Sequence, residues 1–210
     1  MNREERTVIL LERLPKMYPD ARCLLEYDGS AERLLISTIL SARTTDDAVN
    51  RVAPLLWSRV GDLRGLAGAS RDLVEDIVHP LGFFRSKAKA VQEAAAWVLD
   101  RGSVPGSMEE LVRIPGVGRK TAGVVLGEVF GVPAIIVDTH VGRLAGRLDL
   151  ARVRDPDRIE AKLRSVVPME AWTSFSHQLG FHGRRVCTSR APDCTSCGLN
   201  DVCPRRGVPG

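Results

Sequence analysis

The sequence predicts an all-α protein whose chain is divided between two helical domains. Apolar residues recur every three to four positions through most of the 210 residues, which is the spacing of amphipathic helices. Only the run Ala134–Val137 has β-like character, and its four residues between helices favour a buried connector. Hydrophobic residues make up 44% of the chain, enough for a buried core. The Gly131-Val132-Pro133 break is the best candidate for a domain boundary.

Ten helices are predicted from this spacing and from the residues that can start them. The first, 3–14, is amphipathic. The second, 30–42, is strongly apolar, so we expect a central buried helix with Ser30 as its N-cap. Residues 61–68 contain glycines and are expected to form a joint. The other predicted helices are 46–58, 70–79, 85–101, 107–113, 119–130, 138–148, 156–166 and 169–184.

Composition limits the classes of partner. No stretch of about 18 uncharged apolar residues is present, so no membrane span is expected. The N-terminus is charged and lacks the apolar core of a secretory signal, which predicts a cytoplasmic protein. The formal net charge of +4 suits a polyanionic partner without proving one. Aromatic residues are only 5% of the chain, which argues against a surface built from many stacking rings.

The segment 107–130 predicts a hairpin of two helices with an anion site at the turn. Pro115 stops the first helix because it cannot donate the next helical hydrogen bond. Gly116 and Gly118 permit positive φ angles and close approach to the backbone. The turn N–H groups and the dipole of the second helix can then attract one phosphate. A Gly-x-Gly alone would still favour an ordinary packing corner.

Lys120 and Asp138 are the candidate catalytic residues. Lys120 falls in the first turn of the second hairpin helix, where the helix dipole disfavours a cation; partial burial would add to this. A neutral amine is what a Schiff-base nucleophile needs, although position alone favours a surface lysine that contacts phosphate. Asp138 follows an apolar run and opens a helix, so it is predicted to be an N-cap whose fixed carboxylate can stabilise cationic charge.

Four of the five cysteines form a C-terminal group, Cys187-x6-Cys194-x2-Cys197-x5-Cys203. In a reducing compartment this group predicts a metal site rather than disulfides. Four thiolates suit zinc or an iron–sulfur cluster, and the residues alone leave both open. Cys23 lies outside the group and is expected to be a small buried hydrophobe.

The string Ile114–Ala122 resembles the helix–hairpin–helix of the DNA glycosylase superfamily, in particular its endonuclease III branch, and the likeness runs nearly end to end. Lys120 matches the catalytic lysine of the bifunctional members and Asp138 their catalytic aspartate. The cysteine spacing matches the box that holds a 4Fe–4S cluster. The resemblance implies a base-excision repair glycosylase that removes oxidised pyrimidines, with lyase activity at abasic sites.

The resemblance also implies a fold and partners. It implies a six-helix barrel domain, 23–133, and an iron–sulfur domain formed by 1–22 and 134–210, with a DNA-binding cleft between them. The partner would be double-stranded DNA with damaged bases or abasic sites, bound by a monomer at the bacterial nucleoid. The implied DNA contacts are Gly116, Val117, Gly118, Arg119, Arg43, Phe83, Lys87 and His140.

Three departures from the family pattern affect substrate preference. Arg43 stands where many relatives have glutamine, Phe83 where many have leucine, and Gly123 where asparagine is common. They put the lesion spectrum and the opposite-base preference in doubt. Two rivals are an adenine glycosylase, which typically lacks a lysine at position 120, and a glycosylase for thymine or uracil opposite guanine. A rival of another class is a non-catalytic DNA-binding module.

Overall fold

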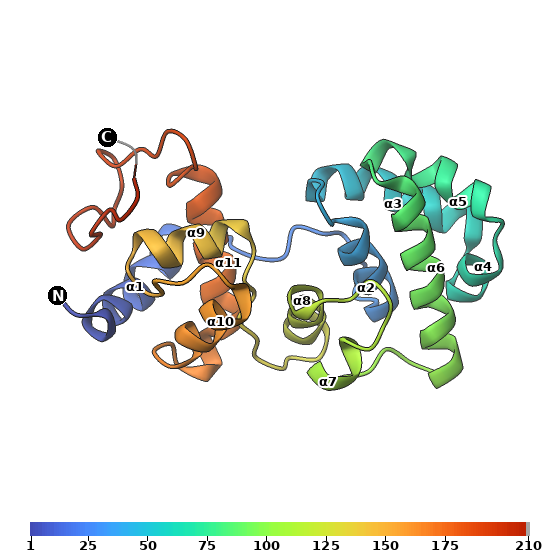
Figure 1. The fold of residues 1–210 in the computed structure, drawn as a ribbon, viewed down its shortest axis with the longest axis horizontal. Coiled ribbons are helices and arrows are strands. Elements are labelled where there is room, and N and C mark those ends of the chain that lie inside the picture. The colour runs from blue at the N-terminus through green and yellow to red at the C-terminus, as the bar shows by residue number, and fades with distance from the viewer. Residues whose placement is uncertain (209–210) are drawn as a thin grey trace. The chain divides into compact units, whose positions relative to one another are not determined.

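The structure, a computed structural model, describes residues 1–208, and within that range its helices are joined by loops, with no strand (Figure 1). The all-α prediction is therefore confirmed. The elements are α1 (Arg3–Met17), α2 (Ala31–Leu40), α3 (Asp46–Val60), α4 (Leu63–Gly68), α5 (Arg71–Val78), η1 (His79–Leu81), α6 (Phe84–Arg101), α7 (Met108–Leu111), α8 (Arg119–Val129), α9 (Thr139–Arg147), α10 (Pro156–Arg164), η2 (Met169–Ala171) and α11 (Trp172–Arg185).

The chain forms two compact units. One contains Met1–Cys23 and Pro133–Gly210, and the other contains Leu24–Val132. The first unit is therefore assembled from both ends of the chain and is called the two-ended unit. The second is called the continuous unit. Each junction lies one residue from the boundary expected from the sequence.

Helix α2 is the centre of the continuous unit. It packs against both α6 and α8, and Figure 1 shows it between them. Ser30 is its N-cap and accepts a hydrogen bond from Arg33 N–H at 3.2 Å, and every residue from Leu34 to Leu40 is buried. The strongly apolar composition after the first turn of this helix thus has a direct cause, because no face of the segment from Leu34 to Leu40 meets water.

Helix α11 is the main support of the two-ended unit. It packs against α9 and against α1. The run 134–137 before α9 has no regular structure, and Ile136 donates its N–H to Ser176 Oγ of α11 at 3.0 Å. This agrees with the predicted buried connector. A buried backbone segment that pairs with no strand needs side chains to accept the hydrogen bonds of its N–H groups.

The prediction that 61–68 is only a joint was wrong, because it contains α4. Asp62 caps this short helix by accepting a hydrogen bond from Gly65 N–H at 2.8 Å, and Leu63 and Leu66 are buried. A Cβ on Gly65 would lie 1.8 Å from the Val60 carbonyl oxygen, so this glycine permits a close backbone approach. Within 1–208, no helix combines the length and apolarity that a membrane crossing requires.

Candidate DNA-repair site and cysteine group

The hairpin turn lies between α7 and α8. Val117 N–H donates to the Ile114 carbonyl at 3.0 Å and closes the turn. Gly116 has φ +79°, and a Cβ there would lie 3.0 Å from Cβ of Ala90. Gly118 is the N-cap of α8, where no side chain caps the helix and nothing lies within 4 Å of an added Cβ. The turn is therefore packed on one side and open on the other.

The open side of the turn carries positive charge. Arg119 and Lys120 occupy the first turn of α8, both are exposed, and that turn has no acidic residue. The sequence analysis considered partial burial of Lys120, but the residue is exposed in the structure. The free N–H groups of a helix N-terminus and two adjacent cations make a surface suited to a phosphate.

Asp138 is the N-cap of α9, as the sequence predicted. Its Oδ1 accepts a hydrogen bond from Val141 N–H at 2.7 Å, and the residue is half-buried. This bond fixes one carboxylate oxygen through the backbone. Asp138 therefore offers a negative charge in one defined position.

His140 follows Asp138 on α9 and is half-buried. Its Nδ1 lies 3.2 Å from the Arg143 guanidinium, which also donates to the Gly183 carbonyl at 2.8 Å. Burial lowers the pKa of His140, and Arg143 adds to this, while the Asp138 carboxylate opposes it. A Cβ on Gly183 would lie 2.9 Å from His140 Cβ, so α9 and α11 meet closely here.

The four C-terminal cysteines line one cavity with about 390 Å³ of empty space, part of it open to solvent. Within residues 1–208, no three His, Cys, Asp or Glu side chains are arranged to hold one metal ion. A tetrahedral zinc site needs its ligands to converge on a single point. An iron–sulfur cluster takes one thiolate per iron and so suits ligands spread around a cavity. Four cysteines around one cavity suit either group. The four residues are Cys187, Cys194, Cys197 and Cys203.

The surroundings of Cys197 and Cys203 act on their thiols in opposite directions. Burial is the main cause that raises the pKa values of the Cys197 and Cys203 thiols, and repulsion from the other cysteines adds to it. Leu199 and Arg205 each point a backbone N–H at a cysteine sulfur, Cys197 and Cys203 respectively, at 3.4 Å. Such donors stabilise sulfur in its anionic, ligating form.

Arg147 is a buried cation beside the first cysteine. It is 5% exposed, and its guanidinium donates to Cys187 Sγ at 3.2 Å and to the Thr188 and Ser189 carbonyls at 2.6 and 2.8 Å. No carboxylate pairs with it within the described chain, 1–208. A buried cation needs negative charge nearby, which thiolates would supply. Sequence reasoning missed Arg147 and Arg143, and their i, i+4 spacing on α9 was the available signal.

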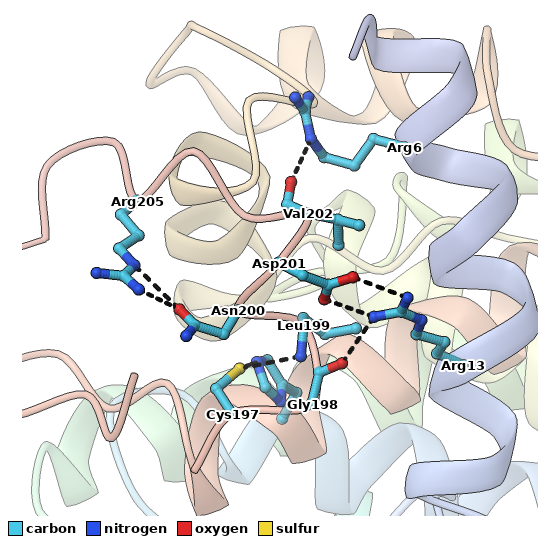
Figure 2. A network of polar contacts seen from close by, with 10 residues as sticks. Arg6, Arg13, Cys197, Gly198, Leu199, Asn200, Asp201, Val202 and Arg205 are labelled. Atoms are coloured by element: carbon cyan, nitrogen blue, oxygen red, sulfur yellow. Dashed lines mark hydrogen bonds and ion pairs between the residues drawn. The ribbon is translucent and has the colours of Figure 1, made fainter. Parts of the chain in front are cut away.

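The cysteine segment is tied to the N-terminal helix (Figure 2). Arg13 pairs with both carboxylate oxygens of Asp201 at 2.6 and 2.9 Å and donates to the Gly198 carbonyl at 3.0 Å. Arg6 is buried and donates to the Val202 carbonyl at 2.9 Å. Arg205 bonds to Asn200 within the segment. Helix α1 thus gives the cysteine segment a fixed support.

The structure brings Arg43 and Phe83 together in the continuous unit. The Arg43 Cζ lies 5.2 Å from the centre of the Phe83 ring, and both residues have positive φ, 56° and 49°.

Lys87 is placed differently from the expectation, because it is 4% exposed and donates to the Leu81 carbonyl at 2.8 Å. Burial lowers its pKa. This placement does not support direct contact between Lys87 and DNA. Cys23, expected to be buried, is half-buried.

Comparison with known proteins places the chain in a family. The model of the HhH-GPD superfamily of base excision DNA repair proteins matches residues 36–169. An endonuclease III from Synechocystis is 45% identical over 206 residues, which cover 97% of this chain and 94% of the relative. The endonuclease III of Escherichia coli K12 is 36% identical, covering 97% and 96%.

Solved structures agree with this assignment. A trapped endonuclease III–DNA covalent intermediate, in an estranged-adenine complex, has a TM-score of 0.93 at 36% identity and covers 98% of this chain and 97% of that one. A thermostable thymine-DNA glycosylase has a TM-score of 0.82 at 22% identity, covering 95% of each chain, which is a likeness of fold alone. The chain therefore belongs to the endonuclease III family of the HhH-GPD superfamily and is a base-excision DNA repair protein.

Proposed function

We propose that this protein is a bifunctional DNA glycosylase and abasic-site lyase that removes oxidised pyrimidines, with Lys120 as nucleophile and Asp138 as the charge that supports it. The observation that carries this proposal is the exposed Lys120 in the first turn of α8, two residues after Gly118, the N-cap, around which nothing blocks the approach of a ligand. A phosphate held at this turn would bring a sugar of the same strand near the lysine amine. Asp138 contributes a carboxylate that its cap bond holds in place.

Lys120 and Asp138 can account for base removal followed by strand cleavage. A damaged nucleotide is first flipped out of the duplex. The Lys120 amine then attacks C1′ of the sugar, the bond from C1′ to the base breaks, and the base leaves with a proton. Opening of the sugar ring gives a Schiff base between Nζ and C1′. Loss of a proton from C2′ expels the 3′ phosphate and cuts the strand. Asp138 stabilises the positive charge that develops on the sugar.

Borohydride trapping on abasic-site DNA tests this proposal. Borohydride reduces the Schiff base to a stable amine, so a covalent protein–DNA adduct is expected with the wild-type protein. Duplexes with an oxidised pyrimidine should give the same adduct after the base is removed. If no duplex gives an adduct while binding persists, the protein is a non-catalytic DNA-binding module. An adduct only with adenine opposite oxidised guanine, or with mismatched thymine, would replace the oxidised-pyrimidine substrate class.

The two hairpin glycines should separate folding from DNA binding. Gly116→Ala is expected to cost about 2–3 kcal/mol of unfolding free energy, since it combines a positive φ with a close contact to Ala90. Gly118→Ala should change stability by less than about 1 kcal/mol but weaken binding to abasic-analogue DNA about tenfold, because its methyl group would stand where the phosphate approaches. Urea unfolding and fluorescence anisotropy measure the two effects. Equal DNA affinities for Gly118→Ala and wild type would remove the turn from the binding surface.

We also propose that the four cysteines hold a 4Fe–4S cluster. Four sulfurs line one cavity, and two backbone N–H groups and one buried guanidinium are directed at sulfur. The spacing of the four cysteines also matches the box that holds such a cluster in the family. The cluster would act as a structural link that orders a segment with little core of its own. Metal analysis of the purified protein tests the assignment, and stoichiometric zinc without iron would contradict it.

Loss of one ligand should disorder the cysteine segment. Cys197→Ala is expected to lose iron and visible absorption and to destabilise the two-ended unit by more than about 3 kcal/mol. Limited proteolysis should then cut within 186–208. Cys23→Ala is the matched control, because Cys23 lies outside the cavity, and it should keep the iron and the absorption. A Cys197→Ala protein with full iron content would show that the ligand set is wrong.

A further inference from the structure

A buried tyrosine–histidine pair lies against the cysteine cavity. His182 belongs to the last turn of α11, lines the cavity and is 2% exposed, and Tyr18 is the C-cap of α1 and is 5% exposed. The Tyr18 hydroxyl oxygen lies 2.7 Å from His182 Nδ1. On the other side of the ring, His182 Nε2 lies 3.7 Å from Cys197 Sγ. The imidazole therefore connects a hydroxyl group to one of the four candidate ligand sulfurs.

Polar atoms at these two buried positions need partners. Removal of a hydroxyl group and an imidazole from water costs free energy unless each finds a hydrogen bond. Apolar side chains of similar shape would fill the same space without that requirement. The Tyr18 hydroxyl and both ring nitrogens of His182 are each within hydrogen-bond distance of a partner, so the requirement is met. One of those partners is a sulfur, which points to a role at the cysteines.

The direction of the hydrogen bonds follows from the state of the sulfur. A cysteine that binds metal does so as a thiolate, which has no proton and can only accept. His182 Nε2 must then carry the proton and donate it to Cys197 Sγ. In a neutral imidazole the other nitrogen is an acceptor, so Nδ1 accepts the proton of the Tyr18 hydroxyl. The two residues thus form a relay in which Tyr18 donates to His182 and His182 donates to sulfur.

The backbone and the ring contacts fix the imidazole in this orientation. The His182 carbonyl accepts a hydrogen bond from Cys187 N–H at 2.8 Å, so His182 touches two of the four cysteines, one through its backbone and one through its side chain. The Tyr18 and His182 rings meet edge to face, with centroids 5.7 Å apart and an angle of 60° between the planes. Rotation of the imidazole away from Cys197 would break both the hydroxyl bond and this ring contact.

An ion pair covers the outer side of the relay. Arg185 donates to both carboxylate oxygens of Asp20 at 3.1 and 2.6 Å. Its Cζ lies 5.9 Å from the centre of the Tyr18 ring and 4.6 Å from that of Phe181. The guanidinium therefore shields the tyrosine ring from water. Hydrogen bonds in such a shielded place are stronger than in water, because solvent does not compete for the donors.

A donor directed at a ligand sulfur changes the properties of the bound group. An N–H bond draws electron density from the thiolate and stabilises the more negatively charged state of a cluster, which raises its reduction potential. It also holds the sulfur in its ligating form and so slows loss of metal. Cys197 accepts from His182 and also from Leu199 N–H at 3.4 Å. Only the first of these donors is a side chain, so it can be replaced by substitution.

We propose that Tyr18 and His182 form a directed hydrogen-bond relay to Cys197 that raises the reduction potential of the cluster and slows the loss of its iron. The inference rests on the proposed 4Fe–4S cluster and is independent of the proposed lysine chemistry. His182 acts on the cluster through the sulfur, and Tyr18 acts through His182. Both are therefore positioning residues.

His182→Leu and His182→Gln test the donor directly. Leucine removes it, so iron should pass to an added chelator about tenfold faster than in wild type. The ratio of reduced to oxidised cluster at a fixed potential should fall about tenfold, which lowers the midpoint potential by about 59 mV for a one-electron couple. Glutamine can place an amide N–H close to the position of Nε2, so both quantities should stay within about threefold of wild type.

Two further variants test the relay and its specificity. Tyr18→Phe keeps the ring but removes the hydroxyl that fixes His182, and it should release iron about threefold faster than wild type. His177→Gln is the matched control, because His177 is another histidine of α11 that does not line the cavity. It should match wild type in release rate and potential.

The measurements are made on the full-length protein as purified with its metal. Absorbance of the ferrous chelate gives the release rate, and protein-film voltammetry gives the midpoint potential. An unchanged rate and potential in His182→Leu would overturn the relay. Equal changes in His182→Leu and His182→Gln would also overturn it, because they would report packing and not a donor. If His182→Leu retains no iron on purification, Tyr18→Phe decides, and its equality with wild type would reject the proposal.

The outcomes separate this inference from the proposed cluster. Zinc in place of iron in the wild-type protein would reject the cluster and with it the predicted potential. A zinc-bound thiolate also accepts hydrogen bonds, so zinc release should then follow the same order among the variants. Loss of that order would reject the relay as well.

Discussion

Lys120→Gln is expected to lower base excision and strand cleavage by at least about 1,000-fold and to abolish the borohydride adduct. Glutamine has similar length and polarity but no nucleophilic amine, so the Schiff base cannot form. Because Lys120 is exposed, its replacement should leave the fold intact. Such a loss would therefore report the chemistry and not a folding defect. Single-turnover kinetics on an oxidised-pyrimidine duplex and trapping on abasic DNA measure the two effects.

Arg119→Gln is the matched control for this variant. It removes one positive charge from the adjacent residue in the same first turn of α8. The expected result is a few-fold loss of DNA affinity with a smaller dependence on salt, while the adduct still forms. If Lys120→Gln shows only the same few-fold change, the lysine contacts phosphate and another group is the nucleophile.

Asp138→Asn is expected to reduce single-turnover excision by at least about 100-fold with a stability change within about 0.5 kcal/mol. Asparagine caps a helix as well as aspartate does, so the bond from Val141 N–H is preserved while the negative charge is lost. The activity change therefore reports the charge, and urea unfolding reports the cap.

Two further variants complete this comparison. Asp138→Ala removes both charge and cap, so it should match Asp138→Asn in activity but lose about 1 kcal/mol of stability. Asp155→Asn changes another aspartate N-cap of the same unit, which accepts a hydrogen bond from Arg158 N–H, and it should leave activity unchanged. Retention of more than a tenth of wild-type activity by Asp138→Asn would remove Asp138 from the chemistry.

Helix α4 shows where prediction of the fold from sequence reached its limit. Gly65 and Gly68 in six residues indicated a joint, because glycine disfavours helices. Burial of Leu63 and Leu66 and the Asp62 cap outweigh that preference. The close approach of the Val60 carbonyl, which explains Gly65, depends on the path of the chain. Long apolar patterns such as α2 were predictable because packing and periodicity agree.

The parts of the candidate site that depend on local sequence position were predictable. Asp138 was expected as an N-cap and is one, and the four cysteines line one cavity as their grouping suggested. Lys87 and Arg147 could not be placed in this way, since a charged residue in a sequence predicts exposure. Burial of each is possible because backbone carbonyls accept its hydrogen bonds, one carbonyl for Lys87 and two or more for Arg147, which only the folded backbone reveals.

The bonds from α1 to the cysteine segment determine the order in which the nascent chain can fold on the ribosome. Residues 24–132 form the continuous unit without any other segment of the chain, so they can fold as soon as they emerge. Helix α1 emerges before this unit but must wait for Asp201 and Val202, the partners of Arg13 and Arg6. A chain released early would leave the apolar side of this helix uncovered, so interrupted synthesis yields a product that proteases can recognise and remove.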